Sequence, residues 1–234
     1  MKAFLLAAGE STRLRPLTHR MPKCLLPVGG KPLLEIWLDM LERIGVKDVL
    51  INTHHIPEKV DDFLKHFNTG LQIQLAFEEE LLGSAGTIKN NRGFVKNEPY
   101  FWIVYADSLT AIDLSPILKF HKHVDSILTL GLFHTDEPQR SGIVKLDEKG
   151  LIVDFIEKPK HPIGDLSNTG IMVASPELID YIPDYYPCDL SVDVFPHLVG
   201  RMYGKVTDEF FIDIGTHESY EIAQRKWDEM KGEM

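Results

Sequence analysis

The sequence predicts an α/β fold, with a Rossmann-like, mainly parallel sheet and a smaller, mixed subregion. In the first half, short apolar runs typical of buried strands alternate with amphipathic helical stretches, which is the pattern of parallel strands joined by crossover helices. In the second half, strand-like runs follow one another directly. The 234 residues, of which 44% are hydrophobic and 26% charged, suit one globular domain with a full core.

The first half is expected to alternate strands with helices. Apolar runs predict strands at Ala3–Leu6, Asp48–Asn52, Ile73–Phe77 and Tyr100–Tyr105. Apolar residues at helical spacing predict helices at Leu33–Ile44, Pro57–Phe67, near Thr87–Asn91 and at Leu114–His123. Gly45 closes the first of these helices, and a proline occupies the first turn of the second.

The second half is expected to begin with a β-meander. Its strands would be Ile127–Phe133, Gly142–Asp147 and Leu151–Glu157, with a hairpin turn at Glu148-Lys149-Gly150. Further elements are expected as a strand at Gly170–Ala174, helical stretches near Glu177–Ile182 and Val192–Val199, a strand at Phe210–Ile214 and a terminal helix over Glu218–Met230.

Composition excludes some partners. The formal net charge of −10 argues against a nucleic-acid binder, because duplex binding needs a basic face. No stretch approaches the ~20 apolar residues of a membrane helix, and the apolar run after Lys2 is too short for a secretory signal. Cys24 and Cys188 lack the spacing of a metal or redox site. We therefore expect a cytoplasmic protein with neither nucleic acid nor membrane as partner.

One region has the opposite charge. Residues 11–34, called the acid-free segment below, contain no Asp or Glu and hold Arg13, Arg15, Arg20, Lys23 and Lys31. Such a segment is either a solvated basic loop or a site for a small polyanion such as a triphosphate.

The segment from Leu5 to Thr18, L-L-A-A-G-E-S-T-R-L-R-P-L-T, begins where the first strand ends, which is where ligands bind in open α/β sheets. Small residues at 8, 9 and 11 would let backbone N–H groups approach phosphate oxygens, and Arg13 can bind two of them. Lys23 adds a point-like charge. Neither the dinucleotide glycine fingerprint nor a P-loop is present.

The spacing T-R-L-x-P-L-T followed by P-K-x-x-x-P-V resembles the signature of sugar-phosphate nucleotidylyltransferases, although Ala8 and Ser11 stand where many members have glycine. Other family elements follow in order over residues 3–220: L-G-S-A-G-T at 82–87, Y-A-D at 105–107, F-I-E-K-P at 155–159, N-T-G-I at 168–171 and F-I-D-I-G-T at 211–216. The resemblance implies transfer of a nucleoside monophosphate from an NTP to a sugar 1-phosphate, with release of pyrophosphate and use of Mg²⁺.

The resemblance also implies an organisation of the chain. It divides a single domain, 1–234, into a nucleotide-binding half (about 1–125), a sugar-phosphate-binding half (about 126–217) and a C-terminal helix (218–234). No acyltransferase-type or hexapeptide extension is expected after the last motif. The oligomeric state, monomer or homo-oligomer, stays open.

Site residues follow from these motifs. The nucleotide is expected to contact Leu6, Ala8, Gly9, Ser11, Thr12, Arg13, Lys23, Glu80, Gly83 and Ser84. The sugar phosphate is expected to contact Gly142, Glu157, Lys158, Asn168 and Gly170. Arg13, Lys23 and Asp107 are the expected catalytic residues, and Asp107 with Asp213 the expected Mg²⁺ ligands. Because both aspartates end apolar strand runs, and parallel strand ends meet at one edge, we expect them to lie together.

Each residue type also has a plainer interpretation. An aspartate after a strand is often a turn or cap residue, and Glu157 with Lys158 also fits a surface pair. In the family interpretation, Arg13 binds the β- and γ-phosphates, Lys23 the α-phosphate region and Lys158 the acceptor phosphate. The nucleophile is already an anion, so no general base is required. Preorganised cations and a divalent ion would supply the catalysis.

The base is less constrained than the reaction. Guanine presents two N–H donors, which suit a carboxylate from Glu78 to Glu80, and residues 189–196 and 213–216 resemble mannose- and heptose-1-phosphate guanylyltransferases. GTP with mannose- or heptose-1-phosphate is therefore the favoured pair. UTP or dTTP with hexosamine-, muramic- or glucose-1-phosphate is the alternative.

Two other functional classes stay open beside the enzyme. A non-catalytic, NDP-sugar-binding regulatory subunit would be expected to lose its charged site residues. Arg13, Lys23, Asp107 and Asp213 are all present. The absent glycine fingerprint counts against a nicotinamide-dependent dehydrogenase.

Overall fold

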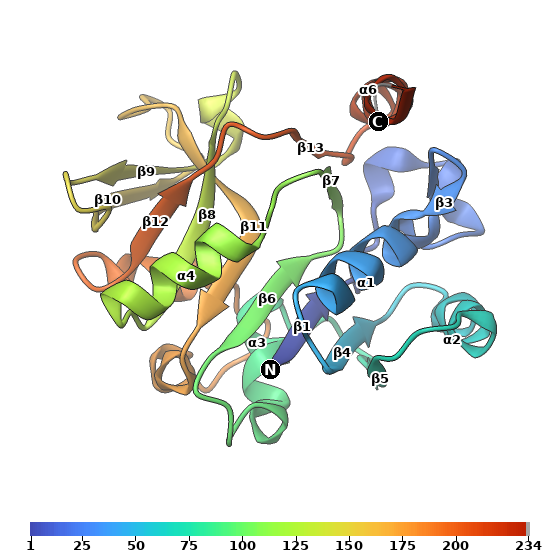
Figure 1. Cartoon of the computed structure of the whole chain (residues 1–234), viewed down its shortest axis with the longest axis horizontal. Coiled ribbons are helices and arrows are strands. Elements are labelled where there is room, and N and C mark those ends of the chain that lie inside the picture. Colours follow the sequence, from blue (N-terminus) through green and yellow to red (C-terminus); the bar gives the residue numbers. More distant parts are fainter. Residues whose placement is uncertain (233–234) are drawn as a thin grey trace.

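The computed structural model describes residues 1–232 and has a mixed sheet at its centre (Figure 1). Nine strands form this sheet, and seven of them follow the order β10-β9-β11-β6-β1-β4-β5, while β8 pairs with β11 and β12. Their bounds are β1 (Lys2–Leu6), β4 (Asp48–Thr53), β5 (Gln72–Phe77), β6 (Phe101–Tyr105), β8 (Leu128–His134), β9 (Gly142–Leu146), β10 (Ile152–Glu157), β11 (Leu166–Ala174) and β12 (Tyr203–Val206). The expected α/β class is confirmed.

The N-terminal part of the sheet is parallel, as expected. β1 pairs in parallel with β4 and β6, and β4 pairs in parallel with β5. Successive residues of β1 belong to different core layers: Ala3 and Leu5 to one, Phe4 and Leu6 to the other. Side chains alternate across a strand, so both faces of β1 are covered, which explains its uninterrupted apolar run.

Helices cover the two faces of the sheet. Their bounds are α1 (Leu33–Arg43), α2 (Pro57–His66), α3 (Ser84–Asn90), α4 (Ser115–Val124), α5 (Phe195–Leu198) and α6 (His217–Gly232). α1 and α4 lie in front of the sheet in Figure 1 and add to one core layer, whereas Ala85 and Ile88 of α3 add to the other. None of the described helices is long and apolar enough to cross a membrane.

The expected β-meander is wrong in one respect. β9 and β10 form the antiparallel hairpin, but β8 does not pair with β9. β11 is longer than expected and lies between β8 and β6, with a register shift between Asn168 and Met172 that lets its start also reach β9. β12, absent from the sequence interpretation, pairs in parallel with β8, and Gly204 packs closely against the Leu132 side chain, which would have to shift for a Cβ, since that atom would lie 2.3 Å away.

Several short elements also differ from expectation. The strand expected at Phe210–Ile214 is β13 (Phe211–Asp213), which pairs antiparallel with β7 (Ser108–Thr110) outside the main sheet. A second small ladder joins β2 (Pro27–Val28) to β3 (Lys31–Pro32). The helical stretch near 177–182 is a 3₁₀-helix, Pro176–Tyr181, and the one near 192–199 is a π-helical turn, Leu190–Val194, that leads into α5.

Candidate active site

Two adjoining cavities open at the ends of β1, β4 and β6. The first cavity measures about 490 Å³ and is lined by Leu6, Ala7, Ala8, Gly9, Ser11, Lys23, Cys24, Asn52, Glu78, Leu81, Gly83, Ser84, Tyr105, Ala106, Asp107, Pro187 and Asp189. The second cavity measures about 260 Å³, and its lining includes Arg140, Ser141, Gly142, Phe155, Glu157, Asn168, Gly170, Ser191, Phe211 and Asp213. Tyr105 and Asp107 line both cavities, so they mark the junction.

The loop after β1 forms one wall of the first cavity. Ser11 has a φ of 51°, a left-handed conformation that favours glycine. Its carbonyl accepts hydrogen bonds from Leu14 N and, at 2.9 Å, from Thr18 Oγ1, which fix the turn despite the side chain. Gly9 has open space where a Cβ would stand. The loop therefore keeps its backbone close to the cavity without the glycine at position 11 that many relatives carry.

Lys23, Asp107 and Asp213 form a charged cluster at the junction. Lys23 Nζ lies 3.3 Å from Asp107 Oδ2 and 3.1 Å from Asp213 Oδ1. The Lys23 side chain is 8% exposed, whereas those of Asp107 and Asp213 are 51% and 56% exposed. The structure thus brings the two aspartates together around the Lys23 ammonium, and their expected role as Mg²⁺ ligands stays a prediction.

The route that joins these aspartates differs from the expected one. Asp213 does not end a parallel strand of the main sheet. β13 pairs with β7 so that Asp213 lies opposite Ser108, and Ile214 N donates to Asp107 O at 3.2 Å. The small antiparallel ladder, rather than a convergence of parallel strands, therefore sets the distance between the carboxylates.

The donor chemistry of this cluster fits a hard divalent cation. Mg²⁺ is usually held by one or two carboxylates together with phosphate oxygens and water. Asp107 and Asp213 supply two half-exposed carboxylates whose position already favours a positive charge, that of Lys23. Among the described residues no group of three or more His, Cys, Asp or Glu could hold a metal. Two carboxylates suit a Mg²⁺ ion whose other ligands are phosphate oxygens and water.

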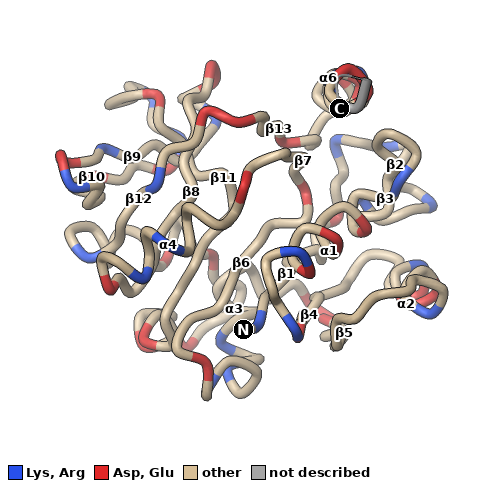
Figure 2. Tube along the Cα trace, viewed as in Figure 1, with Lys and Arg blue, Asp and Glu red and all other residues tan. Residues whose placement is uncertain are grey.

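The other cations of the acid-free segment do not gather in the first cavity. Figure 2 shows basic positions spread around β2 and β3, and Lys31 pairs there with Glu35 and Asp39. Arg13 and Thr12 lie outside the lining of both cavities. The Arg13 guanidinium nevertheless lies beside Gly215, where a Cβ would stand 2.9 Å from Nη2 and 3.1 Å from the Asp213 carboxylate. It is close to the cluster without contacting the cavity.

The glutamates before Gly83, residues 78–80, differ in their exposure to solvent. Glu80 is exposed and does not line the first cavity, whereas Glu78 lines it and is buried. Glu78 Oε1 accepts from Asn52 Nδ2 at 2.9 Å and from Thr87 Oγ1, and Oε2 accepts from Leu82 N at 3.1 Å. Of the acidic residues considered for the base, Glu78 is the one that the structure places at the cavity.

The expected acceptor residues gather on the second cavity, with one exception. Gly142, Glu157, Asn168 and Gly170 line it. A Cβ at Gly142 would lie 2.6 Å from Glu157 Oε2, so this glycine makes room for the carboxylate. Lys158 is 66% exposed, lies outside the lining, and has its Nζ 3.5 Å from Glu157 Oε1.

Sequence reasoning missed several residues of the two cavities. Burial raises the pKa of the Tyr105 phenol above its ordinary value, and Gly170 leaves room for its ring, since a Cβ there would lie 3.0 Å from Tyr105 Cβ. Asp189 Oδ1 accepts from Ser84 N at 3.0 Å and from Ser84 Oγ at 3.1 Å. Tyr105 stands beside Asp107 in the Y-A-D motif, so its place at a strand end was the one available signal. The position of Asp189 depends on a contact across 105 residues.

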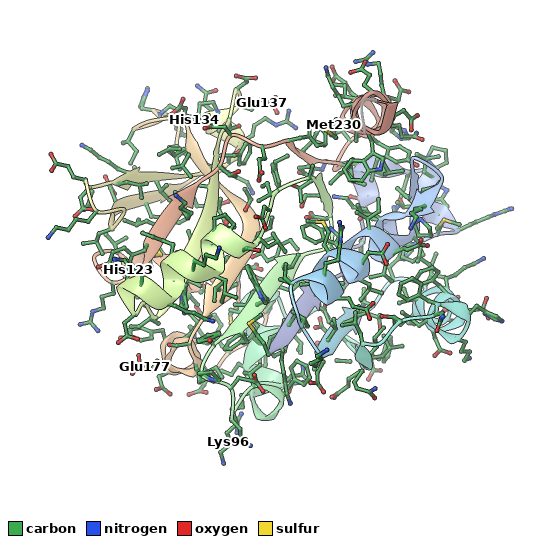
Figure 3. The ribbon with its side chains drawn as sticks, viewed as in Figure 1. Lys96, His123, His134, Glu137, Glu177 and Met230 are labelled. Atoms are coloured by element: carbon green, nitrogen blue, oxygen red, sulfur yellow. The ribbon has the colours of Figure 1, made fainter. Side chains whose placement is uncertain are left out.

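One cation of the second cavity was also missed. Arg140 lines this cavity, and its guanidinium contacts Glu137 at 2.8 Å. Figure 3 shows Glu137 near His134, at one end of β8. Both Arg140 and Lys158 are thus surface cations paired with a neighbouring glutamate.

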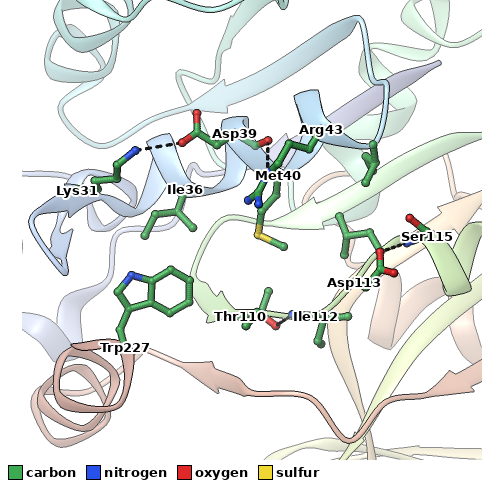
Figure 4. A pocket seen from close by; sticks show the side chains of 13 residues that line it. Lys31, Ile36, Asp39, Met40, Arg43, Thr110, Ile112, Asp113, Ser115 and Trp227 are labelled. Carbon is green, nitrogen blue, oxygen red and sulfur yellow. Dashed lines mark hydrogen bonds and ion pairs between the residues drawn. The ribbon is translucent and has the colours of Figure 1, made fainter. Parts of the chain in front are cut away.

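A larger cavity, about 590 Å³, lies away from these motifs (Figure 4). It lies between α1, the chain around β7 and the helix α6, with Met40, Thr110, Ile112 and Trp227 among its lining residues. None of the expected site residues lines it. Its size alone therefore does not make it the reaction site.

Comparison with known proteins decides the family. The profile of the nucleotidyl transferase family matches residues 2–229. The chain belongs to the nucleotidyl transferase family. Its members include a UTP–glucose-1-phosphate uridylyltransferase of Synechocystis, 34% identical over 96% of this chain, and a mannose-1-phosphate guanylyltransferase of Mycobacterium tuberculosis, 34% identical over 93%. The chain spans 63% and 62% of the length of these two relatives.

Solved structures of the nucleotidyl transferase type share the fold. HddC from Yersinia pseudotuberculosis superposes with a TM-score of 0.81 at 26% identity, over 97% of this chain and 99% of HddC. A Bacillus anthracis protein assigned as a glucose-1-phosphate thymidylyltransferase superposes with a TM-score of 0.87 at 24% identity, over 97% of this chain and 94% of that protein. The second likeness is one of fold alone.

Proposed function

We propose that this nucleotidyl transferase moves a nucleoside monophosphate from an NTP to a sugar 1-phosphate and releases pyrophosphate. The observation that carries the proposal is the Lys23–Asp107–Asp213 cluster at the junction of two cavities. The loop after β1 forms one wall of the first cavity, and most of the expected sugar-phosphate residues line the second. A reaction between two anionic substrates needs positive charge where they meet.

The residues have distinct roles in this proposal. Lys23 stabilises charge at the α-phosphate, and Arg13 reaches the β- and γ-phosphates from the edge of the first cavity. The acceptor phosphate lies in the second cavity, where Lys158 turns from Glu157 toward it. Because that phosphate is already an anion, the side chains position and neutralise, and none has to remove a proton.

Mg²⁺ is the cation that we propose for Asp107 and Asp213. When bound, it offsets the negative charge of the reacting phosphates. Lys23 Nζ already lies at an oxygen of each aspartate, so Lys23 would exchange a carboxylate for a phosphate oxygen if the aspartates held the cation. This exchange needs no large movement, since Lys23 already lines the first cavity.

GTP with mannose- or heptose-1-phosphate is the pair that we propose first. Glu78 places a carboxylate at the first cavity, and a carboxylate accepts the imino N–H of guanine. Guanylyltransferases are also among the relatives at 32–34% identity, and one structural neighbour, HddC at 25% identity, was solved with GMP-PN.

A second pair is favoured by a specific observation. Three protein donors already contact the Glu78 carboxylate, which has room for about four, so one acceptor direction is left. This remaining acceptor position on Glu78 can accept the single imino N–H of uracil or thymine, but it cannot accept both N–H donors of guanine. UTP or dTTP with a hexosamine-, muramic- or glucose-1-phosphate is therefore the alternative, and the Synechocystis relative is a uridylyltransferase.

A panel of the four common NTPs and dTTP against several sugar 1-phosphates, read as pyrophosphate release, tests the proposal. We expect release that requires both substrates and a divalent cation. Binding of an NDP-sugar without release from any pair would instead favour the non-catalytic regulatory subunit and would overturn the enzymatic proposal.

A further inference from the structure

A buried amide, that of Asn52, connects two walls of the first cavity, the loop after β1 and Glu78. Asn52 is 5% exposed and lies near the end of β4. Its Oδ1 accepts from Ala7 N at 2.7 Å. Its Nδ2 donates to Glu78 Oε1 at 2.9 Å and to Thr87 Oγ1 at 3.1 Å. One side chain thus links the loop after β1, the end of β5 and the helix α3.

The strand register explains why an amide suits this position. In the parallel ladders, Asn52 lies beside Leu6 on one side and Ala76 on the other. Ala7 therefore directly follows the β1–β4 ladder, and Glu78 directly follows the β4–β5 ladder. An asparagine carries an acceptor and a donor on one planar group, so it satisfies a backbone N–H and a carboxylate at once. An aspartate would lack the donor, and an apolar residue would leave Ala7 N unpaired and remove one of the three donors to Glu78.

The same contacts orient the Glu78 carboxylate. Asn52 and Thr87 both donate to Oε1, and Leu82 N donates to Oε2. The unused acceptor direction is therefore on Oε2. Bases with an imino N–H, which are guanine, uracil and thymine, can donate to it, whereas adenine and cytosine present a ring-nitrogen lone pair at the corresponding position.

We propose that Asn52 is a positioning residue that couples base selection by Glu78 with phosphate placement by the loop after β1. This inference rests on the proposed function. Asn52 lines the first cavity, but its Nδ2 donates to Glu78 and Thr87, so the amide is proposed to act through its protein partners. It fixes Ala7, the first residue of the loop that contains Ala8 and Gly9, and it decides which oxygen of Glu78 faces the base. Through these two contacts, Asn52 would help to position both the base and the phosphates of a nucleotide whose base carries an imino N–H.

The test compares two readouts in the full chain. The first is the ratio of kcat/KM for the preferred NTP to that for ATP, which reports base selection. The second is the inhibition constant of inorganic tripolyphosphate, which reports the phosphate loop without a base. Asn52→Ala is expected to lower the ratio and to weaken inhibition by tripolyphosphate, each roughly tenfold, because Glu78 loses one of the donors that orient it and Ala7 N loses its buried partner.

Two further variants distinguish the two contacts of the Asn52 amide from each other and from a general loss of folding. Thr87→Val removes one donor to Glu78 and no bond to Ala7, so the ratio should fall while tripolyphosphate inhibition stays at the wild-type value. Asn52→Asp combined with Glu78→Gln exchanges amide and carboxylate, restores a donor–acceptor pair, and should recover most of the ratio lost in Asn52→Ala. Thr129→Val is the matched control, because it removes a buried hydroxyl that contacts His121 away from both cavities.

The outcomes are distinct. A change of both readouts in Asn52→Ala, with only the ratio altered in Thr87→Val, supports the coupling. A lower melting temperature with both readouts unchanged, as expected for Thr129→Val, would make Asn52 structural and overturn the inference. If the wild-type chain releases no pyrophosphate from any substrate pair, the proposed function fails instead.

Discussion

The two cavities differ in how firmly their charges are held. On the nucleotide side, Lys23 and Glu78 are buried and each has more than one fixed partner. On the acceptor side, Arg140 and Lys158 are mostly exposed and each contacts a neighbouring glutamate. The charges of the first cavity are therefore held more rigidly than those of the second, although in the proposed reaction Lys23, like Arg140 and Lys158, has to exchange a carboxylate for a phosphate oxygen. Rigid, buried charges should matter more for turnover than mobile, exposed ones.

The largest effect is expected at Lys23. Lys23→Ala removes the one buried cation of the charged cluster, and turnover should fall by about 10²–10³, the cost of losing one preorganised charge contact in a transition state. Steady-state pyrophosphate release measures it, with circular dichroism to verify the fold. Lys31→Ala is the matched control within the acid-free segment, since Lys31 only pairs with Glu35 and Asp39. A near-normal kcat in Lys23→Ala would remove the assignment of this cavity to the triphosphate.

Asp213→Asn should rank next. The variant keeps the shape of the side chain but halves the carboxylate charge available to Mg²⁺, so activity at ordinary Mg²⁺ should be nearly lost and partly recovered at high Mg²⁺ or with Mn²⁺. A titration of rate against metal concentration measures this shift. Asp208→Asn, on the exposed chain before β13, should leave the metal dependence as in the wild type. A rate loss that no metal concentration changes would mean that Asp213 acts only through Lys23.

Most of the expected nucleotide residues and most of the expected sugar-phosphate residues line the two cavities, whereas the long-range contacts that bring them together could not be predicted from the sequence. Lys23 and Asp107 follow short motifs whose strand-end position is itself predictable from apolar runs. Asp213 was placed correctly for the wrong reason, because the β7–β13 pairing is a contact over 100 residues that no local pattern encodes. β12 was missed for the same reason, because its partner β8 lies about 70 residues earlier in the chain. Asn52 gave no signal, because an isolated asparagine at a strand end looks like a turn residue until its partners are known.

A smaller effect is expected at Lys158, and it should affect one substrate only. Lys158→Ala removes an exposed cation near the second cavity, so KM for the sugar phosphate should rise roughly tenfold while KM for the NTP stays constant. Lys160→Ala, in the same loop, is the control for general loss of surface charge. Equal weakening of both substrates would show that the two cavities do not divide the substrates as proposed.

The smallest effect concerns stability rather than chemistry. His121 of α4 is buried against Thr129, and burial lowers the pKa of its imidazole to about 4. The unfolded chain takes up a proton near pH 6.5 that the folded chain does not, so stability should fall as the pH drops from about 6.5 toward 4. Asp125 opposes the shift by favouring the charged form, and the Tyr100 ring lies edge-on to the imidazole.

Melting temperatures measured between pH 7 and 5 test this expectation. His121→Gln should lose less stability over that range than the wild type, because it has no proton to gain on unfolding. Identical slopes would show that His121 does not contribute to the pH dependence. The active-site ranking would be unaffected, since His121 lies outside both cavities.

We propose that Lys23, Asp107 and Asp213 mark the point where nucleotide and acceptor meet around one cation. A crystal structure with Mg²⁺, a non-hydrolysable NTP analogue and a sugar 1-phosphate would show this arrangement. We expect one Mg²⁺ at about 2.1 Å from an oxygen of each aspartate, with the nucleotide in the first cavity and the sugar phosphate in the second. A nucleotide bound elsewhere, or an ion held without either aspartate, would contradict it.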